Sequence, residues 1–180
     1  MRSGIYAKAG ANPDTRYLQA SHFDRFGKLD LTVEPVLQSD ASLSRHLLQD
    51  GDVLFVAKGQ ENFGVVYTAD YGRGVASSSF VVVRVNDPFR PQLLPAYLSW
   101  FLTNTPEIAQ THRKQLSTTV PSISLTALKQ LEIAIPPVEQ QQRILDLNAL
   151  SLRETALYEE LTALKRKVIK QRLFNAISND

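Results

Sequence analysis

Over the first half of the chain, hydrophobic residues occur in short runs separated by polar and turn-forming residues, and this pattern predicts β-strands. The clearest strands are expected at 52–58, 63–68 and 80–86, which are rich in valine, because β-branched residues favour an extended backbone. Two weaker strands are expected at 3–8 and 15–20, joined by a turn-rich segment. These strands are expected to form the sheet of a compact domain.

Short helices are expected between and after the strands. Leucines at helical spacing predict one over 41–49. Pro95 opens a second helix through Thr103, and Pro106 opens a third to about Gln115, since proline is well tolerated in a first helical turn. The order of elements lacks the strict β-α-β alternation of a doubly wound fold. The sequence therefore predicts an α+β fold with a mixed or antiparallel sheet and short helices.

The segment 118–144 joins two parts of the chain that differ in kind. Ser124 stands before an apolar-periodic run, as the N-cap of a short helix does, and the alternation over 131–135 predicts a buried strand. The pair Pro136-Pro137 then prevents continuation, because proline lacks a backbone N–H and biases the preceding residue away from helix. We therefore predict a domain over 1–138 and a long C-terminal helix over 139–180.

The predicted long helix has a hydrophobic seam typical of a coiled coil. From Glu139 to about Ser178 there is no glycine or proline, and about 40 residues of helix are roughly 60 Å long. Such a helix gains most of its stability by burying an apolar face. It either packs back on its own domain or pairs with a helix of another chain, and its length favours the second. The heptad positions that we predict to bind the partner helix are Leu150, Leu157, Leu161, Leu164 and Val168. The polar residue Glu154 interrupts this series.

The chain resembles a known family in the order of several motifs. The stretch from Ser122 to Ile144, SISLTALKQLEIAIPPVEQQQRI, is similar to the junction in the specificity subunits of type I restriction–modification systems, where a target recognition domain runs into a long spacer helix. Upstream, the segments 17–27, 51–59, 74–80 and 95–102 also fit that family. The resemblance covers nearly the whole chain.

The resemblance implies a non-catalytic subunit that recognises a double-stranded DNA sequence in the cytoplasm. Family members typically carry two recognition domains and two such helices, whereas this sequence has one of each. A homodimer with antiparallel helices would then read a split palindromic site. S-adenosylmethionine, ATP and Mg would be held by partners, namely a modification subunit that methylates adenine and a restriction subunit that translocates and cleaves DNA.

Polar loop residues are the candidates for DNA contact. Hydroxyls, amides and cations supply most contacts to phosphate, and glutamine or asparagine suits bidentate pairing with adenine. Each cluster alone is also typical of a solvated loop, and the resemblance favours DNA because loops of this domain face DNA in relatives. The candidates are Lys58, Gln60, Asn62, Arg73, Ser77, Ser78, Ser79, Arg113, Lys114, Gln115, Ser117, Thr118 and Thr119.

Charge and composition add little to this picture. The formal net charge is only +2, with 13 Lys/Arg against 12 Asp/Glu up to residue 138 and 7 against 6 beyond it. A positive face must therefore be assembled by folding. The basic residues of 165–172 are explained by the helix dipole or by contact with DNA or an acidic partner. The absence of cysteine excludes disulfides and favours an intracellular setting, and no apolar run is long enough for a membrane span.

Catalytic motifs are not found in the sequence. The three histidines, His22, His46 and His112, lack metal-ligand spacing, and there is neither a dinucleotide-binding nor a Walker glycine motif. Two other interpretations stay open. One is a protein-interaction module that docks a methyltransferase, or regulates a full-length specificity subunit, without reading DNA. The other is a fragment of a longer gene.

Overall fold

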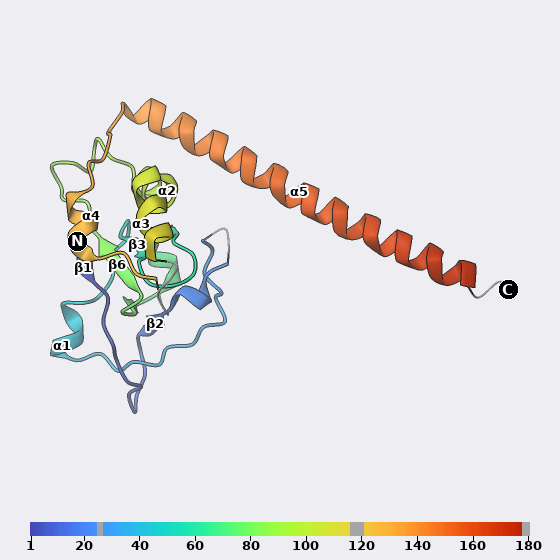
Figure 1. Cartoon of the computed structure of the whole chain (residues 1–180). Coiled ribbons are helices and arrows are strands. Elements are labelled where there is room, and N and C mark those ends of the chain that lie inside the picture. The colour runs from blue at the N-terminus through green and yellow to red at the C-terminus, as the bar shows by residue number, and fades with distance from the viewer. Residues whose placement is uncertain (25–26, 116–120, 178–180) are drawn as a thin grey trace. The chain divides into compact units, whose positions relative to one another are not determined.

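A computed structural model describes residues 1–24, 27–115 and 121–177 (Figure 1). The chain divides into two compact units, Met1–Gln141 and Gln142–Asp180. The long helix α5 spans Val138–Ile177, whereas the sequence analysis placed the end of the domain at residue 138. The first turn of this helix belongs to the first unit by its contacts.

The first unit is built on a four-stranded antiparallel sheet with the strand order β1-β6-β3-β4. In the centre of this sheet, Leu54 of β3 lies opposite Val82 on one neighbouring strand and Val65 on the other. Every residue of β3 and of β6 is buried, which explains why both appear in the sequence as continuous apolar runs rather than alternating ones. The strands are β1 (Arg2–Ser3), β3 (Val53–Val56), β4 (Gly64–Val66) and β6 (Phe80–Val83).

A second, two-stranded sheet pairs β2 (Arg16–Leu18) in parallel with β5 (Gly74–Ala76). The sequence analysis missed β5, because it has three residues and begins with a glycine. A Cβ added at Gly74 would lie 3.4 Å from both Leu18 and Tyr67, which is an ordinary van der Waals distance. The predicted α+β fold with a mixed or antiparallel sheet is confirmed: the main sheet is antiparallel, and the parallel β2-β5 pair forms a separate sheet.

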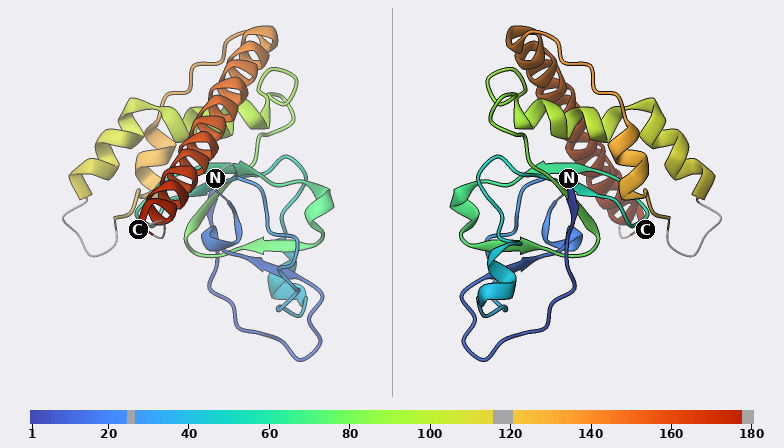
Figure 2. Two further views of the ribbon diagram at one scale, coloured as in Figure 1. Left: turned by 90° about the vertical axis from the view of Figure 1, so that its right-hand side faces the viewer. Right: turned by 90° about the vertical axis from the view of Figure 1, so that its left-hand side faces the viewer.

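The two faces of the four-stranded sheet are covered by different elements. Helix α2 (Pro95–Asn104) packs against β3 and β4, and Figure 2 shows it lying above the sheet. On the other side is the main hydrophobic core, shared between the sheet, the β2-β5 pair and the loops around them. This core is formed by Leu18, Phe23, Leu29, Leu48, Leu54, Val56, Val65, Tyr67, Ala76, Phe80 and Val82.

Helix α1 (Ala41–Ser44) is much shorter than the predicted helix over 41–49. It begins as expected, with the Asp40 carboxylate accepting a hydrogen bond from the N–H of Leu43. It ends after one turn because the next three carbonyls, of residues 45–47, accept hydrogen bonds from the guanidinium of Arg2. A tertiary contact therefore replaces the helical hydrogen bonds that the leucine spacing favoured.

Two more short helices follow α2, and both match the prediction. Helix α3 spans Pro106–Gln115 and α4 spans Leu125–Gln130. The hydroxyl of Ser124 accepts a hydrogen bond of 3.1 Å from the N–H of Ala127, which confirms Ser124 as the N-cap of α4. Short 3-10 turns occur at Ala20–His22 and Ala69–Tyr71.

The prediction of a strand over 131–135 is wrong. The segment has no strand pairing, and Ile135 is 43% exposed. The alternation that suggested a strand does reflect alternating burial of residues 131–134, but the backbone is fixed by a side chain instead of a ladder. The Tyr97 hydroxyl of α2 donates a hydrogen bond of 2.9 Å to the carbonyl of Ala134.

Candidate nucleic-acid and helix interfaces

Two of the segments predicted to contact DNA, 58–62 and 77–79, meet the segment before α4 at one edge of the first unit. The backbone N–H groups of Ala57 and Lys58 both donate to the carbonyl of Ser79, at 2.9 and 3.3 Å. The carbonyl of Ala57 in turn accepts a hydrogen bond of 2.7 Å from Ile123. The loop after β3, the turn between β5 and β6, and the segment before α4 are therefore held together by backbone bonds, and we call them the 58–79–122 edge.

Polar side chains at this edge reach solvent. Lys58, Gln60 and Ser78 are exposed, and an isolated bridge pairs Lys58 with Ser122. The edge thus presents one cation, one amide and one hydroxyl from residues far apart in sequence. This is the kind of group that contacts phosphate oxygens and base edges.

Other candidates at this edge have structural partners within the fold. The side-chain N–H of Asn62 donates 2.7 Å to the carbonyl of Val56, while its Oδ1 is buried and accepts no hydrogen bond among the described residues. Ser77 is 6% exposed, and its hydroxyl lies 2.7 Å from that of Ser79. Pairing of Asn62 with a base stays a prediction, and it requires the bond to Val56 to open.

Arg73 lies away from the 58–79–122 edge. It precedes β5 whereas Ser77 follows it, and four residues of extended chain span about 13 Å. Its guanidinium is 4.0 Å from the carboxylate of Asp14, and both side chains are half exposed. The structure therefore does not bring Arg73 together with Lys58.

The last group of candidates is only partly described. Arg113, Lys114 and Gln115 form the end of α3, and their side chains lie outside the described part of the chain. Ser117, Thr118 and Thr119 lie outside the described residues altogether. Their contact with DNA stays a prediction.

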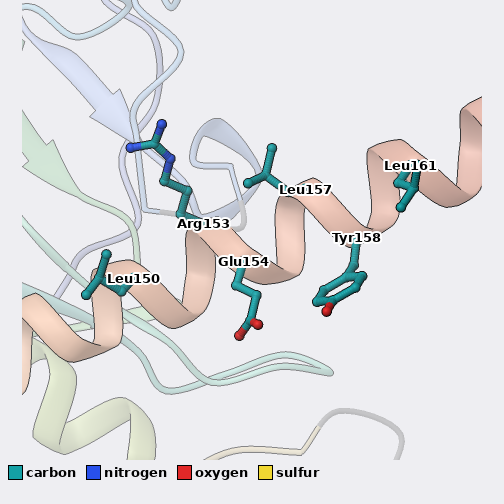
Figure 3. A pocket seen from close by; sticks show the side chains of 6 residues that line it. All are labelled: Leu150, Arg153, Glu154, Leu157, Tyr158 and Leu161. Atoms are coloured by element: carbon teal, nitrogen blue, oxygen red, sulfur yellow. The ribbon is translucent and has the colours of Figure 1, made fainter.

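The predicted seam of α5 is exposed throughout. The five seam residues are between 46% and 64% exposed, although apolar side chains of this size are ordinarily buried. Figure 3 shows Leu150, Leu157 and Leu161 along the helix, with Arg153 beside them. Leu147 extends the seam by one position and is 68% exposed. The sequence analysis missed it, together with a second apolar row formed by Ile169, Leu173 and Ile177.

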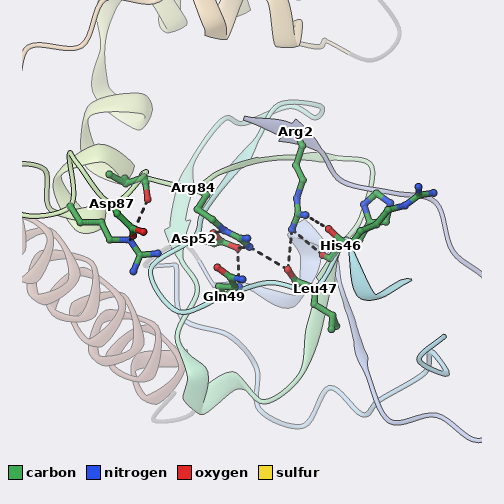
Figure 4. A network of polar contacts seen from close by, with 10 residues as sticks. Arg2, His46, Leu47, Gln49, Asp52, Arg84 and Asp87 are labelled. Atoms are coloured by element: carbon green, nitrogen blue, oxygen red, sulfur yellow. Dashed lines mark hydrogen bonds and ion pairs between the residues drawn. The ribbon is translucent and has the colours of Figure 1, made fainter. Parts of the chain in front are cut away.

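Three arginines that the sequence analysis did not single out hold the domain together. Arg84 donates through Nε and Nη2 to the two carboxylate oxygens of Asp52, both at 2.7 Å (Figure 4). This pairing raises the pKa of Arg84 above its ordinary value. Arg2 contacts the carbonyls after α1, and Arg16 donates to Val33 and Tyr71. An arginine flanked by apolar residues, as in VVVRV at 81–85, is the signal that points to such a role.

Gln141 is a further residue that the sequence analysis passed over. It is fully buried although it is polar. Its amide nitrogen donates to the carbonyls of Gln92 and Pro136, at 2.6 and 2.7 Å, and its oxygen accepts from the N–H of Leu94 at 2.9 Å. The first turn of α5 is therefore fixed to the loop before α2 and to the proline pair.

No group of three potential metal ligands occurs among the described residues, and no helix in the described part of the chain is long and apolar enough to cross a membrane. His22 belongs to a 3-10 turn. His46 follows α1, where burial lowers its pKa with help from the charge of Arg2.

The chain was compared with curated proteins and with models of protein families. No curated protein matches it. A family model described as the type I restriction modification DNA specificity domain matches residues 41–163. The match begins at α1, includes the 58–79–122 edge and the proline joint, and continues along α5 through Leu161. Since it covers more than half of the sequence, the chain belongs to the family of type I restriction modification DNA specificity domains.

Proposed function

We propose that this chain is the sequence-reading subunit of a type I restriction–modification system, and that it acts as a homodimer through α5. The observation that carries the proposal is the extent of the family match, which includes most of the recognition domain and most of the helix. Membership supports a role in DNA recognition. The homodimer, the split site and the partner subunits are the further steps of the proposal.

The 58–79–122 edge is the proposed DNA-contacting surface. Its exposed groups come from loops, whose side chains differ easily between relatives without disturbing the core. Backbone hydrogen bonds fix the three segments to one another, so that a cation and two polar side chains are presented by a rigid support. Lys58 suits phosphate or guanine, and Gln60 suits adenine.

The proposed dimer rests on the exposed seam of α5. A second copy of the chain would supply a helix that covers this seam and a second recognition domain. Two identical domains related by a two-fold axis would read the two halves of a palindrome. The exposed leucines of α5 support this step, because a row of them along about 30 Å of helix leaves the helix without the apolar contacts on which its stability depends.

Catalysis is assigned to the partners. We propose that a modification subunit binds S-adenosylmethionine and methylates adenine, and that a restriction subunit uses ATP and Mg to translocate and cleave DNA. This chain would direct both to their target.

Mapping of methylated adenines in the host genome tests this function. Deletion of the gene should abolish methylation at one split palindromic motif, and a plasmid copy should restore it. If every methylated motif survives the deletion, the chain does not direct a methyltransferase to DNA.

The exposed seam equally favours a second function, in which α5 docks a methyltransferase or exchanges with a helix of a full-length specificity subunit. Selection of binding sequences from a random DNA pool by the purified chain, alone and with the methyltransferase, separates the two. Enrichment of a split palindrome supports the reader. A pool that stays random in both conditions supports the docking module.

A further inference from the structure

Charged residues beside the seam of α5 form a regular series. Positions seven apart on one flank are occupied by Asp146, Arg153, Glu160 and Lys167, so that the sign of the charge alternates along the helix. All four side chains are exposed. The carboxylate of Asp146 also accepts a hydrogen bond of 2.9 Å from Gln142. Flanking charges of this kind set the partner, the orientation and the register of coiled-coil helices.

We infer that two copies of α5 pair antiparallel in a single register, in which Leu150 lies opposite Leu161 of the second copy and Leu147 lies opposite Leu164. This inference rests on the proposed homodimer and specifies its geometry. In this register, Arg153 meets Glu160 of the second copy and Asp146 meets its Lys167. Two-fold symmetry repeats each contact, which gives four pairs of opposite charge.

The neighbouring registers bring like charges together. A shift of one heptad that places Leu150 opposite Val168 brings Arg153 to Lys167 and Glu160 to its own copy. A shift in the other direction brings Arg153 to Arg153 and Asp146 to Glu160. Among these three registers, the proposed one alone pairs opposite charges at every one of these contacts between Asp146, Arg153, Glu160 and Lys167.

A parallel pair is disfavoured by the polar residue within the seam. Glu154 occupies a seam position, and in a parallel dimer the two Glu154 carboxylates would face each other between the helices. In the proposed antiparallel register, Glu154 lies opposite Leu157 of the second copy instead. A charge opposite an apolar residue weakens the dimer less than two facing charges, and it selects the orientation.

The register fixes the distance between the two domain joints. It places Leu173 level with Val138 of the second copy, so that the helices overlap over almost their whole length. The two Val138 residues are then separated by 35 residues of helix, which is about 50 Å. The gap between the two halves of the target would thus be set by the charge pattern of α5.

Engineered cysteines test the register directly, because the natural chain contains none. The double variant L150C/L161C should form a disulfide-linked dimer under mild oxidation. Within one chain these two positions are about 16 Å apart, too far for an internal disulfide. L150C/V168C probes the register one heptad away, and L150C alone probes a parallel pair. Both should stay free of cross-linked dimer.

Charge reversal provides the second test. R153E should raise the dissociation constant of the dimer on the order of tenfold, since two attractive contacts become repulsive, and R153E/E160R should restore it. Sedimentation of the cysteine-free chain tests the homodimer separately from its register. A dimer that cross-links through L150C/V168C or L150C alone overturns the register and leaves the homodimer. A monomer at micromolar concentration overturns both.

Discussion

The side-chain oxygen of Gln141 lies 2.9 Å from the backbone nitrogen of Leu94, at the start of α2. The same side chain donates to two carbonyls, of Gln92 and Pro136, so that a fully buried amide satisfies three backbone groups at once. Buried polar groups are tolerated when all their hydrogen bonds are made. The hydrogen bonds of Gln141 thus make the start of α5 part of the domain.

Replacing Gln141 by leucine should destabilise the domain by about 2–4 kcal/mol, because three partly buried backbone groups lose their hydrogen-bond partner. Denaturant unfolding followed by the fluorescence of Trp100 measures the effect. The neighbouring Gln142 is exposed and contacts Asp146 on the helix surface, so Gln142→Leu should change stability by less than about 0.5 kcal/mol. Equal effects of the two substitutions would contradict the role given to Gln141.

Arg84 and Arg90 offer a matched pair of arginine–aspartate contacts. The partner of Arg84, Asp52, is 1% exposed, whereas the partner of Arg90, Asp87, is 92% exposed. Arg84→Met should therefore cost about 3 kcal/mol, because it leaves a buried carboxylate without its counter-charge. Arg90→Met should cost at most about 0.5 kcal/mol. Unfolding in urea compares them, and a loss below 1 kcal/mol for Arg84→Met would show that Asp52 tolerates the lost partner.

The sequence predicted the elements whose signals are local. These signals act on the residues next to them. They are Ser124 before α4, the prolines that open α2 and α3, and the absence of glycine along α5, and the structure has those helices where they were expected. The failures come from contacts between distant residues. Helix α1 ends early because the guanidinium of Arg2 donates to the carbonyls of residues 45–47, which follow it. Apolar and polar residues alternate over 131–135, but the segment pairs with no strand.

The candidate site shows the same division. The sequence identified polar loops, but it gave no sign that Lys58 and Ser79 meet while Arg73 lies at the other end of β5. That arrangement depends on β3-β6 pairing, which joins residues about 25 positions apart. Gln141 was missed because a glutamine in a polar stretch looks solvent-exposed until the fold buries it.

The acid sensitivity of the loop around Asp14 follows from its hydrogen bonds. Donation from the hydroxyl of Ser39, and from that of Thr15, lowers the pKa of Asp14 below its ordinary value. A lowered pKa stabilises the fold above about pH 4, and this contribution is lost as the pH falls through the pKa of the folded state. Ser39→Ala should raise the pKa of Asp14 in a carboxyl NMR titration. Thr15→Ala should raise it less, since the bond from Ser39 has the larger effect, and an unchanged pKa in Ser39→Ala would exclude this cause.

Lys58 is expected to contact a phosphate. Lys58→Met should weaken binding to all DNA sequences alike and reduce the slope of log K against log salt by about 0.9. Arg90 lies beyond β6, at the end of the sheet opposite to Lys58, so Arg90→Met removes the same charge away from the proposed surface and should leave the slope unchanged. Salt titrations of binding to the mapped target measure both. Parallel changes in the two variants would reflect net charge alone.

The seam of α5 is tested by one substitution on it and one away from it. Leu161→Asp places a charge between the two helices, where it cannot be solvated, and should convert the dimer to monomer in sedimentation at micromolar concentration. Leu152 is 40% exposed on the same helix, but it lies nine residues before Leu161 and therefore about 180° around the helix, at 100° per residue. Leu152→Asp should stay dimeric. Dissociation by both substitutions would mean that the dimer uses more than one face of α5, or that a charge anywhere on this helix unfolds it, and far-UV circular dichroism of the two variants distinguishes these outcomes.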